Sequence, residues 1–190
     1  MNHPLISLLQ LTREIPVADQ ESIINAFEQR TVKEGERLSE PGQINRNLFF
    51  ICKGVLRIVM QNENGNEVTH YFLKENQFCT IMNSFTNDVI AQESIQAACN
   101  AEVLAISKNK LLQLYEQLPY LKAIIDQIIQ QALLDKIQIR NAYLGQDSAT
   151  RYQLFLSKQP EIALKVSLTD IASYLGITPQ SLSRIRKNIR

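Results

Sequence analysis

The C-terminal end of the chain carries a group of cations suited to binding phosphate. From Pro179 to Arg190 there are four cations and no anion, although the whole chain has a net charge of only +1. Residues 148–190 hold seven cations and two anions, a net +5, and the preceding residues have a net −4. A basic end of this kind is typical of nucleic-acid binding, and a solvated helix end is the structural alternative.

The stretch over residues 166–186 has the spacing of two short helices joined by a tight turn. Ser167 and Asp170 predict a capping box, in which the serine accepts from a backbone N–H and the aspartate reaches back. Gly176 is expected to end the first helix, because the turn requires a residue that tolerates positive φ. Thr178 can then cap the second helix.

This spacing is that of a DNA-binding helix-turn-helix, and an ordinary helical hairpin is the alternative. Side chains near the start of the second helix would reach base edges in the major groove. Arg184 suits guanine and Gln180 suits adenine, whereas Arg186, Lys187 and Arg190 suit phosphates. The complete predicted DNA-contacting set is Ser167, Thr169, Thr178, Gln180, Ser181, Arg184, Arg186 and Lys187.

Short β-type runs separated by glycines precede this motif and predict a β-barrel or jelly roll over about residues 31–107. Asn64-Gly65 predicts a type I′ hairpin turn, in which both residues have positive φ. Residues 1–30 are predicted to be helical. The predicted strand runs are Leu48–Cys52, Val55–Met60, Val68–Leu73, Phe78–Met82, Ile95–Ala98 and Val103–Ile106.

A long helix without internal proline or glycine is predicted from Tyr120 to Leu144, after a shorter helix from Lys108 to Leu118. Gly145 is a plausible C-cap of the long helix. Its apolar residues cover a wide arc, so it can pack against the barrel and also against a second copy in a homodimer. A core helix of a monomer is the alternative.

Composition restricts the class and the compartment. The chain has 190 residues with 45% hydrophobic and 21% charged residues, which is ordinary globular composition. No apolar run is long enough to predict a membrane span, and the N-terminus lacks the layout of a signal peptide. Three cysteines without C-x-x-C spacing argue against disulfides and favour a reducing, cytoplasmic location.

With the motif in place, the chain resembles the Crp/Fnr family of bacterial transcription regulators over nearly its whole length. The sensor part of the resemblance rests on Gly35, Gly42, Phe50, Gly54 and the hairpin at Gly65. It implies an α+β fold: a double-stranded β-helix (jelly-roll-like) sensor domain, a long dimerisation helix and a C-terminal helix-turn-helix (winged-helix-like) DNA-binding domain. The expected bounds are 1–118, 119–145 and 146–190, and only a strand at Ala163–Val166 is left to contribute to a wing.

The sequence departs from the nucleotide-binding members of that family. Their phosphate cassette needs a ribose-binding Glu and a phosphate-binding Arg, and neither is present here. Glu93 would instead place a negative charge near the phosphate, so we expect no useful cyclic-AMP affinity. The residues at the corresponding effector pocket are Thr80, Met82, Asn83, Gln92, Glu93 and Ser94.

No cofactor or metal is predicted. Residues 1–51 lack the cysteines that iron–sulfur sensors of the family use, and Ile81 occupies the position of the histidine in haem sensors. His70 is interpreted as a solvated or core imidazole rather than a metal ligand. Cys79 is either redox-active or an inert core residue.

The sequence offers no enzymatic site. Two distant histidines cannot form a cupin metal centre, and no catalytic triad, P-loop or carboxylate pair is present. The predicted function is a homodimeric transcription regulator on a pseudo-palindromic operator in double-stranded DNA, with an unknown effector or none. A hinge at Gly145–Ser148 would re-aim the DNA readers. RNA polymerase remains open as a further partner. The alternative is a ligand-binding regulatory protein without direct promoter control.

Overall fold

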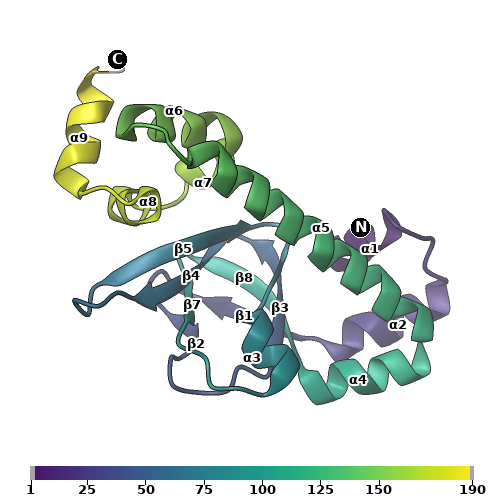
Figure 1. The fold of residues 1–190 in the computed structure, drawn as a ribbon. Helices are drawn as coiled ribbons and strands as arrows, with labels where there is room; N and C mark the ends of the chain where they lie inside the picture. The colour runs from purple at the N-terminus through teal and green to yellow at the C-terminus, as the bar shows by residue number, and fades with distance from the viewer. Residues whose placement is uncertain (1–2, 189–190) are drawn as a thin grey trace.

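The computed structural model describes residues 3–188, which form two sheets and a set of helices (Figure 1). The strands are β1 (Glu28–Val32), β2 (Arg37–Ser39), β3 (Asn47–Lys53), β4 (Val55–Gln61), β5 (Glu67–Lys74), β6 (Phe78–Cys79), β7 (Ser94–Ala97) and β8 (Ala101–Ser107). The helices are α1 (Pro4–Gln10), α2 (Val17–Ala26), α3 (Met82–Asn87), α4 (Lys108–Gln117), α5 (Pro119–Tyr143), α6 (Ser148–Lys158), α7 (Pro160–Ala163), α8 (Leu168–Leu175) and α9 (Pro179–Asn188).

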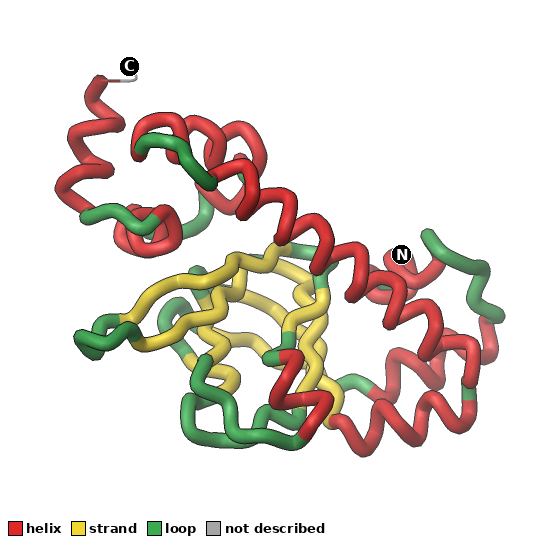
Figure 2. Tube along the Cα trace, in the orientation of Figure 1, coloured by secondary structure: helices red, strands yellow, loops and turns green. Residues whose placement is uncertain are grey.

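The strands form a β-roll of two four-stranded antiparallel sheets, with strand orders β1-β8-β3-β6 and β2-β7-β4-β5 (Figures 1 and 2). Apolar side chains from both sheets meet in one buried cluster, which includes Phe49 and Val103 from the first sheet and Leu56 and Ile95 from the second. The predicted jelly-roll-like sensor fold is confirmed. So is the order of β-roll, long helix and C-terminal helices.

Gly54 is required where the chain passes between β3 and β4. Its φ is +93°, and a Cβ atom built on it would lie 2.6 Å from the backbone oxygen of Asn100. A side chain at this position would therefore meet backbone, which cannot move aside as a flexible side chain would.

The β4–β5 hairpin forms where it was predicted, but the predicted type I′ turn is wrong. Only Gly65 has positive φ, and Asn64 does not. The N–H of Gly65 donates to the oxygen of Asn62 at 2.9 Å, and the Asn62 side chain accepts from the N–H groups of Asn64 and Asn66. An asparagine side chain thus stabilises a longer loop, with the glycine in the left-handed position.

Two other local predictions are corrected, and two strands were not predicted. The run Phe78–Met82 forms only the two-residue strand β6, and α3 begins at Met82. The helical reading of residues 1–30 ends too late, because β1 starts at Glu28. Strands β1 and β2 gave no periodic signal. Both are edge strands, which have a hydrogen-bonded neighbour on one side only, and polar side chains are tolerated there.

The long helix is confirmed as α5, and Gly145 follows it with φ +72°. The first half of α5 is buried against the roll through Leu121, Ile124 and Ile125. Its second half exposes a row of large apolar side chains: Leu133 by 54%, Leu134 by 53% and Ile137 by 46%. Among residues 3–188, no helix combines the length and hydropathy that crossing a bilayer needs.

Four helices, α6 to α9, form the C-terminal unit at the end of α5 (Figure 1). The strand expected at Ala163–Val166 is wrong, since Ala163 ends α7 and a turn follows it. Residues 146–188 therefore contain helices and turns but no strand. A wing is absent from this part of the chain.

Candidate nucleic-acid interface and effector pocket

The helix-turn-helix is formed by α8 and α9, and the predicted caps at Ser167 and Thr178 and the glycine turn are present. The Ser167 Oγ accepts from the N–H of Asp170 at 3.1 Å at the start of α8. Gly176 ends α8 with φ +66°. The Thr178 Oγ1 accepts from the N–H of Ser181 at 3.1 Å and so caps α9. Each cap satisfies a backbone group that the helix end leaves unpaired.

A buried apolar core packs the two helices against each other. Ala172 and Leu182 are fully buried, and they pack with Leu175, Ile171 and Phe155 in one cluster. Arg151 in α6 donates to the backbone oxygen of Leu175 at 2.6 Å, at the last turn of α8. This arginine was not among the predicted residues. It is one of the C-terminal cations, but its charge is directed into the turn rather than to a ligand.

The outer face of α9 is exposed. Gln180, Ser181, Arg184, Arg186 and Lys187 all lie on it. Among the described residues, no carboxylate pairs with any of these three cations within 4.0 Å. Arg190 lies outside the described residues. A helix with this exposed, unpaired polar face is geometrically able to enter a DNA groove.

The remaining predicted contact residues lie near the starts of the two helices. Thr169 is exposed in the first turn of α8, and Ser167 is half-buried at its N-cap. Because the hydroxyl oxygens of Ser167 and Thr178 accept the cap hydrogen bonds, these residues have less capacity left to accept from a ligand. Ser167 can still donate its hydroxyl hydrogen to a phosphate oxygen, whereas the Thr178 hydroxyl already donates to the Ser181 Oγ at 3.0 Å.

The predicted capping box is only half formed, because Asp170 does not reach back to Ser167. Its carboxylate is paired with Arg57 on β4. The Arg57 guanidinium also donates to the Gln96 Oε1 at 2.9 and 2.6 Å and to the Thr69 Oγ1 at 3.0 Å. The pair thus anchors the first helix of the motif to the second sheet of the roll.

Further contacts complete this interface between the β-roll and the C-terminal unit. Phe72 of β5 lies against Phe155 and Tyr174, with ring centroids 6.3 and 5.1 Å apart. The N–H of Thr69 donates to the Ser173 Oγ at 2.9 Å. Burial raises the pKa of Tyr174. The phenol therefore stays neutral, as its apolar surroundings require.

Two ion pairs cross the rim of the interface. Lys74 pairs with Glu161 at 2.5 Å, and Lys165 pairs with Glu75 at 2.7 Å. The hydrogen bond from the Lys165 ammonium holds the pKa of Glu75 below its ordinary range. Lys165 is therefore occupied within the molecule. Among the described cations of the C-terminal unit, those without a carboxylate partner are Arg151 and Lys158 on α6 and Arg184, Arg186 and Lys187 on α9.

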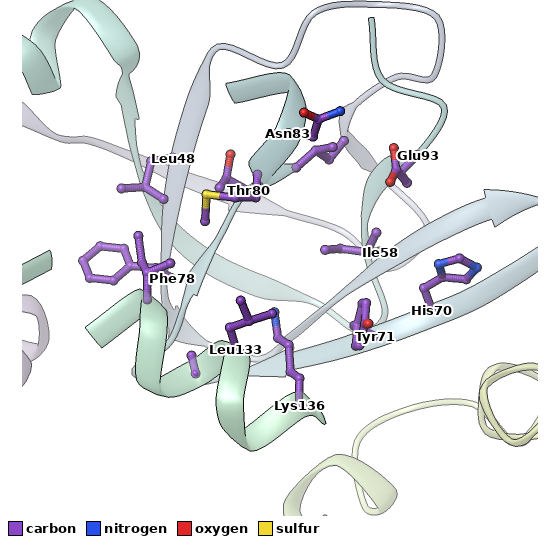
Figure 3. A pocket seen from close by; sticks show the side chains of 14 residues that line it. Leu48, Ile58, His70, Tyr71, Phe78, Thr80, Asn83, Glu93, Leu133 and Lys136 are labelled. Atoms are coloured by element: carbon purple, nitrogen blue, oxygen red, sulfur yellow. The ribbon is translucent and has the colours of Figure 1, made fainter. Parts of the chain in front are cut away.

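A cavity of about 260 Å³ lies between the roll and α5 (Figure 3). Four of the six predicted effector residues line it: Thr80, Met82, Asn83 and Glu93. Gln92 is exposed away from it, and Ser94 is buried within β7. The remaining lining is mostly apolar and consists of Leu48, Ile58, His70, Tyr71, Phe78, Ile81, Ile129, Ala132, Leu133 and Lys136.

Lys136 and Tyr71 were not predicted as pocket residues. The ammonium of Lys136 lies 5.2 Å from the centroid of the Tyr71 ring. A signal was present in the sequence: Ile129, Ala132 and Lys136 are spaced three and four apart, so they share one helix face. This spacing therefore predicts that Lys136 lies on the apolar face of the helix that packs against the roll.

Redox and metal chemistry receive no support from the residues around the cavity. Cys79 is buried, and burial raises its pKa to about 12. At neutral pH the reactive thiolate is therefore scarcely populated, which favours the inert interpretation. His70 is exposed on β5, at the edge of the cavity. Within residues 3–188, no group of three metal-ligating side chains is found.

Known proteins share this architecture. Residues 29–118 match the family model of the cyclic nucleotide-binding domain. No curated protein sequence matches the chain. Among solved structures, the chain is similar to the c-di-GMP responsive global regulator CLP of Xanthomonas campestris, with a TM-score of 0.71 and 18% identity over 92% of this chain and 91% of that one.

Two further structures have the same fold. FixK2 of Bradyrhizobium japonicum has a TM-score of 0.72 and 14% identity, over 86% of this chain and 84% of that chain. A putative transcriptional regulator of the Crp/Fnr family from Eubacterium rectale has a TM-score of 0.70 and 17% identity, over 96% and 87%. At these identities the comparison shows the fold that the chains share.

Proposed function

We infer that the chain regulates transcription by binding specific DNA sequences, because residues 29–118 match the family model of the cyclic nucleotide-binding domain and the chain has the fold of Crp/Fnr transcription regulators. The observation that carries this proposal is the outer face of α9. It presents cations without carboxylate partners within the described residues, on a helix that packs against the C-terminal core through the buried Leu182 and the partly buried Ile185. On this proposal the protein acts in the cytoplasm and carries out no enzymatic step.

On this proposal, the exposed side chains of α9 divide the work of recognition. Gln180 lies in its first turn and Arg184 near its middle, and both read base edges. Arg186 and Lys187 contact phosphates, which adds affinity with little sequence information. Thr169 and the N-terminal amides of α8 contact the DNA backbone beside the groove.

We also infer a homodimer that uses the second half of α5. Leu134 and Ile137 are about half exposed there, although they are large apolar residues in a helix of 25 residues. A second copy of the same helix would remove this surface from water. Two readers related by a two-fold axis would then select a pseudo-palindromic operator.

The effector pocket is inferred not to bind cyclic AMP in the usual way. No arginine among residues 3–188 lines the cavity, and Glu93 contributes a carboxylate to it. An anionic phosphate next to that carboxylate would be repelled. A ligand-binding regulatory protein without promoter control remains the alternative, and it leaves the basic face of α9 without a role.

Selection from a random pool of duplex DNA, followed by gel-shift titration of the enriched site, tests the proposal. Arg184→Ala should cost about 1–3 kcal/mol and relax the preference at one base position. Lys187→Ala should weaken all sequences about equally and reduce the salt dependence. Arg30→Ala, on the exposed strand β1, is the matched control. Failure to enrich any site, or unchanged specific binding by Arg184→Ala, would refute the proposal.

A further inference from the structure

The cavity between the roll and α5 has one lysine and no arginine among the described residues that line it, and most of its lining is apolar. Lys136 enters it from α5, next to Leu133 and opposite Ile58 (Figure 3). Within the described chain, no carboxylate lies within 4.0 Å of its ammonium, although ten other pairs of this kind are formed. A charged amine withdrawn from water without a counter-ion is unfavourable.

The surroundings of Lys136 are only partly compensating. The Tyr71 ring lies 5.2 Å from the ammonium, and a cation–π contact offsets part of the desolvation. Burial lowers the pKa of Lys136, which is the response of an amine that lacks an anionic partner. An anion entering the cavity would therefore gain a counter-ion that has already lost most of its water.

Glu93 restricts which anion can enter. It lines the same cavity from the segment before β7, apart from Lys136 and beyond Ile58 (Figure 3). A ligand with a second negative charge would place that charge toward this carboxylate. The rest of the lining, including Phe78 and Ile129, offers apolar contacts and few hydrogen-bond partners. The cavity therefore suits one negative charge on an apolar body.

We propose that this cavity binds a small apolar monocarboxylate, whose carboxylate pairs with Lys136 and whose hydrocarbon body contacts Ile58, Phe78 and Leu133. The volume of about 260 Å³ is small for a ligand site, so the occupant is small as well. The fold of the chain does not identify the effector, and the residues that bind a nucleotide phosphate are not found in its sequence. A small apolar monocarboxylate is the effector class that the cavity lining favours.

Occupancy would be transmitted to the C-terminal unit through two residues. Tyr71 and Lys136 also line a second hollow, together with Gln159, Ile162 and Tyr174 of the C-terminal unit and its boundary with β5. A ligand that draws the Lys136 ammonium toward the first cavity changes the position of a side chain that lines both the cavity and the second hollow. This regulatory step rests on the proposed DNA binding, whereas ligand binding itself does not.

Calorimetric titration and thermal-shift measurements on the full chain, without DNA, test the binding. The probes are octanoate, the neutral octanol and the dicarboxylate octanedioate. Octanoate should bind at least tenfold more tightly than the other two. Lys136→Met should lose at least tenfold in octanoate affinity with octanol unaffected, and Lys136→Arg should retain most of it. Lys110→Met, an exposed lysine on α4, is the control and should leave the affinity unchanged.

A second variant tests the charge restriction from the opposite side. Glu93→Gln should raise the octanedioate affinity at least tenfold while octanoate still binds. The proposal is overturned if octanoate does not bind, if Lys136→Met binds it as tightly as the wild type, or if Lys136→Met changes only the mass of the dimer. The last result would make Lys136 a counter-ion for a partner subunit. Gel shifts scored separately keep a failure of DNA binding distinct from a failure of ligand binding.

Discussion

Asp170→Asn would remove the charge that Arg57 holds across the interface between α8 and the β-roll. The two side chains are only 14% and 13% exposed. Breaking a buried pair costs about 3–5 kcal/mol when the remaining charge is left alone. Arg57 keeps its bonds to Gln96 and Thr69. We therefore expect a smaller loss of about 1.5–3 kcal/mol, the range for one hydrogen bond to a charged group.

Native-state hydrogen exchange on the α8 amides measures this loss directly, because it reports local opening of the interface. A cost of about 2 kcal/mol corresponds to roughly 30-fold faster exchange. Lys53→Gln is the control, since the Lys53–Glu102 pair spans 3.9 Å with side chains 73% and 43% exposed. That variant should cost less than about 1 kcal/mol.

A double-mutant cycle with Arg57→Met separates the pair from its neighbours. The coupling energy between Arg57 and Asp170 should exceed about 0.5 kcal/mol, because the stability losses at independent sites are additive to within about that value. Additive losses would show that the two residues act separately. In that case the ion pair would not be what holds the helix-turn-helix to the roll.

Three further outcomes are expected. Gly54→Ala should destabilise the chain by about 1–3 kcal/mol in urea unfolding, since a Cβ meets backbone at positive φ; unchanged stability would contradict the close approach. The stability gap between wild type and Glu75→Gln should be present at neutral pH. It should vanish as the pH falls through the pKa of Glu75, which Lys165 holds below its ordinary value of 4.5; a gap that widens in acid would refute this. Leu134→Asp should shift the mass measured by light scattering toward the monomer, and the similarly exposed Leu112→Asp should not; equal masses for wild type and Leu134→Asp would exclude this helix face as the dimer contact.

Much of the helix-turn-helix was predictable because its determinants are local. A cap such as Ser167 or Thr178 acts on a backbone N–H three residues away, and Gly176 decides the conformation of its own position. The same holds for the length of α5, which contains no internal proline or glycine. None of these depends on what lies elsewhere in the fold.

Polar edges and turns were the least predictable parts of the roll. Strand β1 reads as a polar segment and becomes a strand only by pairing with β8. The β4–β5 turn depends on the side chain of Asn62 accepting two hydrogen bonds, which a two-residue motif does not reveal. Local pattern therefore predicted the strands with buried side chains, including the edge strand β5, and missed the more polar edge strands β1 and β2.

Helix caps, turns and hydrophobic periodicity act over a few residues. The amino-acid sequence is therefore enough to predict a β-roll with glycine turns, a long apolar helix and a capped, basic helix-turn-helix. The partners of the charged side chains are known only from the folded chain. It directs Asp170 and Lys165 to the interface with the roll, and it places Lys136 in the cavity without a counter-ion. Those roles depend on which surfaces are in contact after folding. Contacts between segments that are distant in the sequence produce no local pattern of residues.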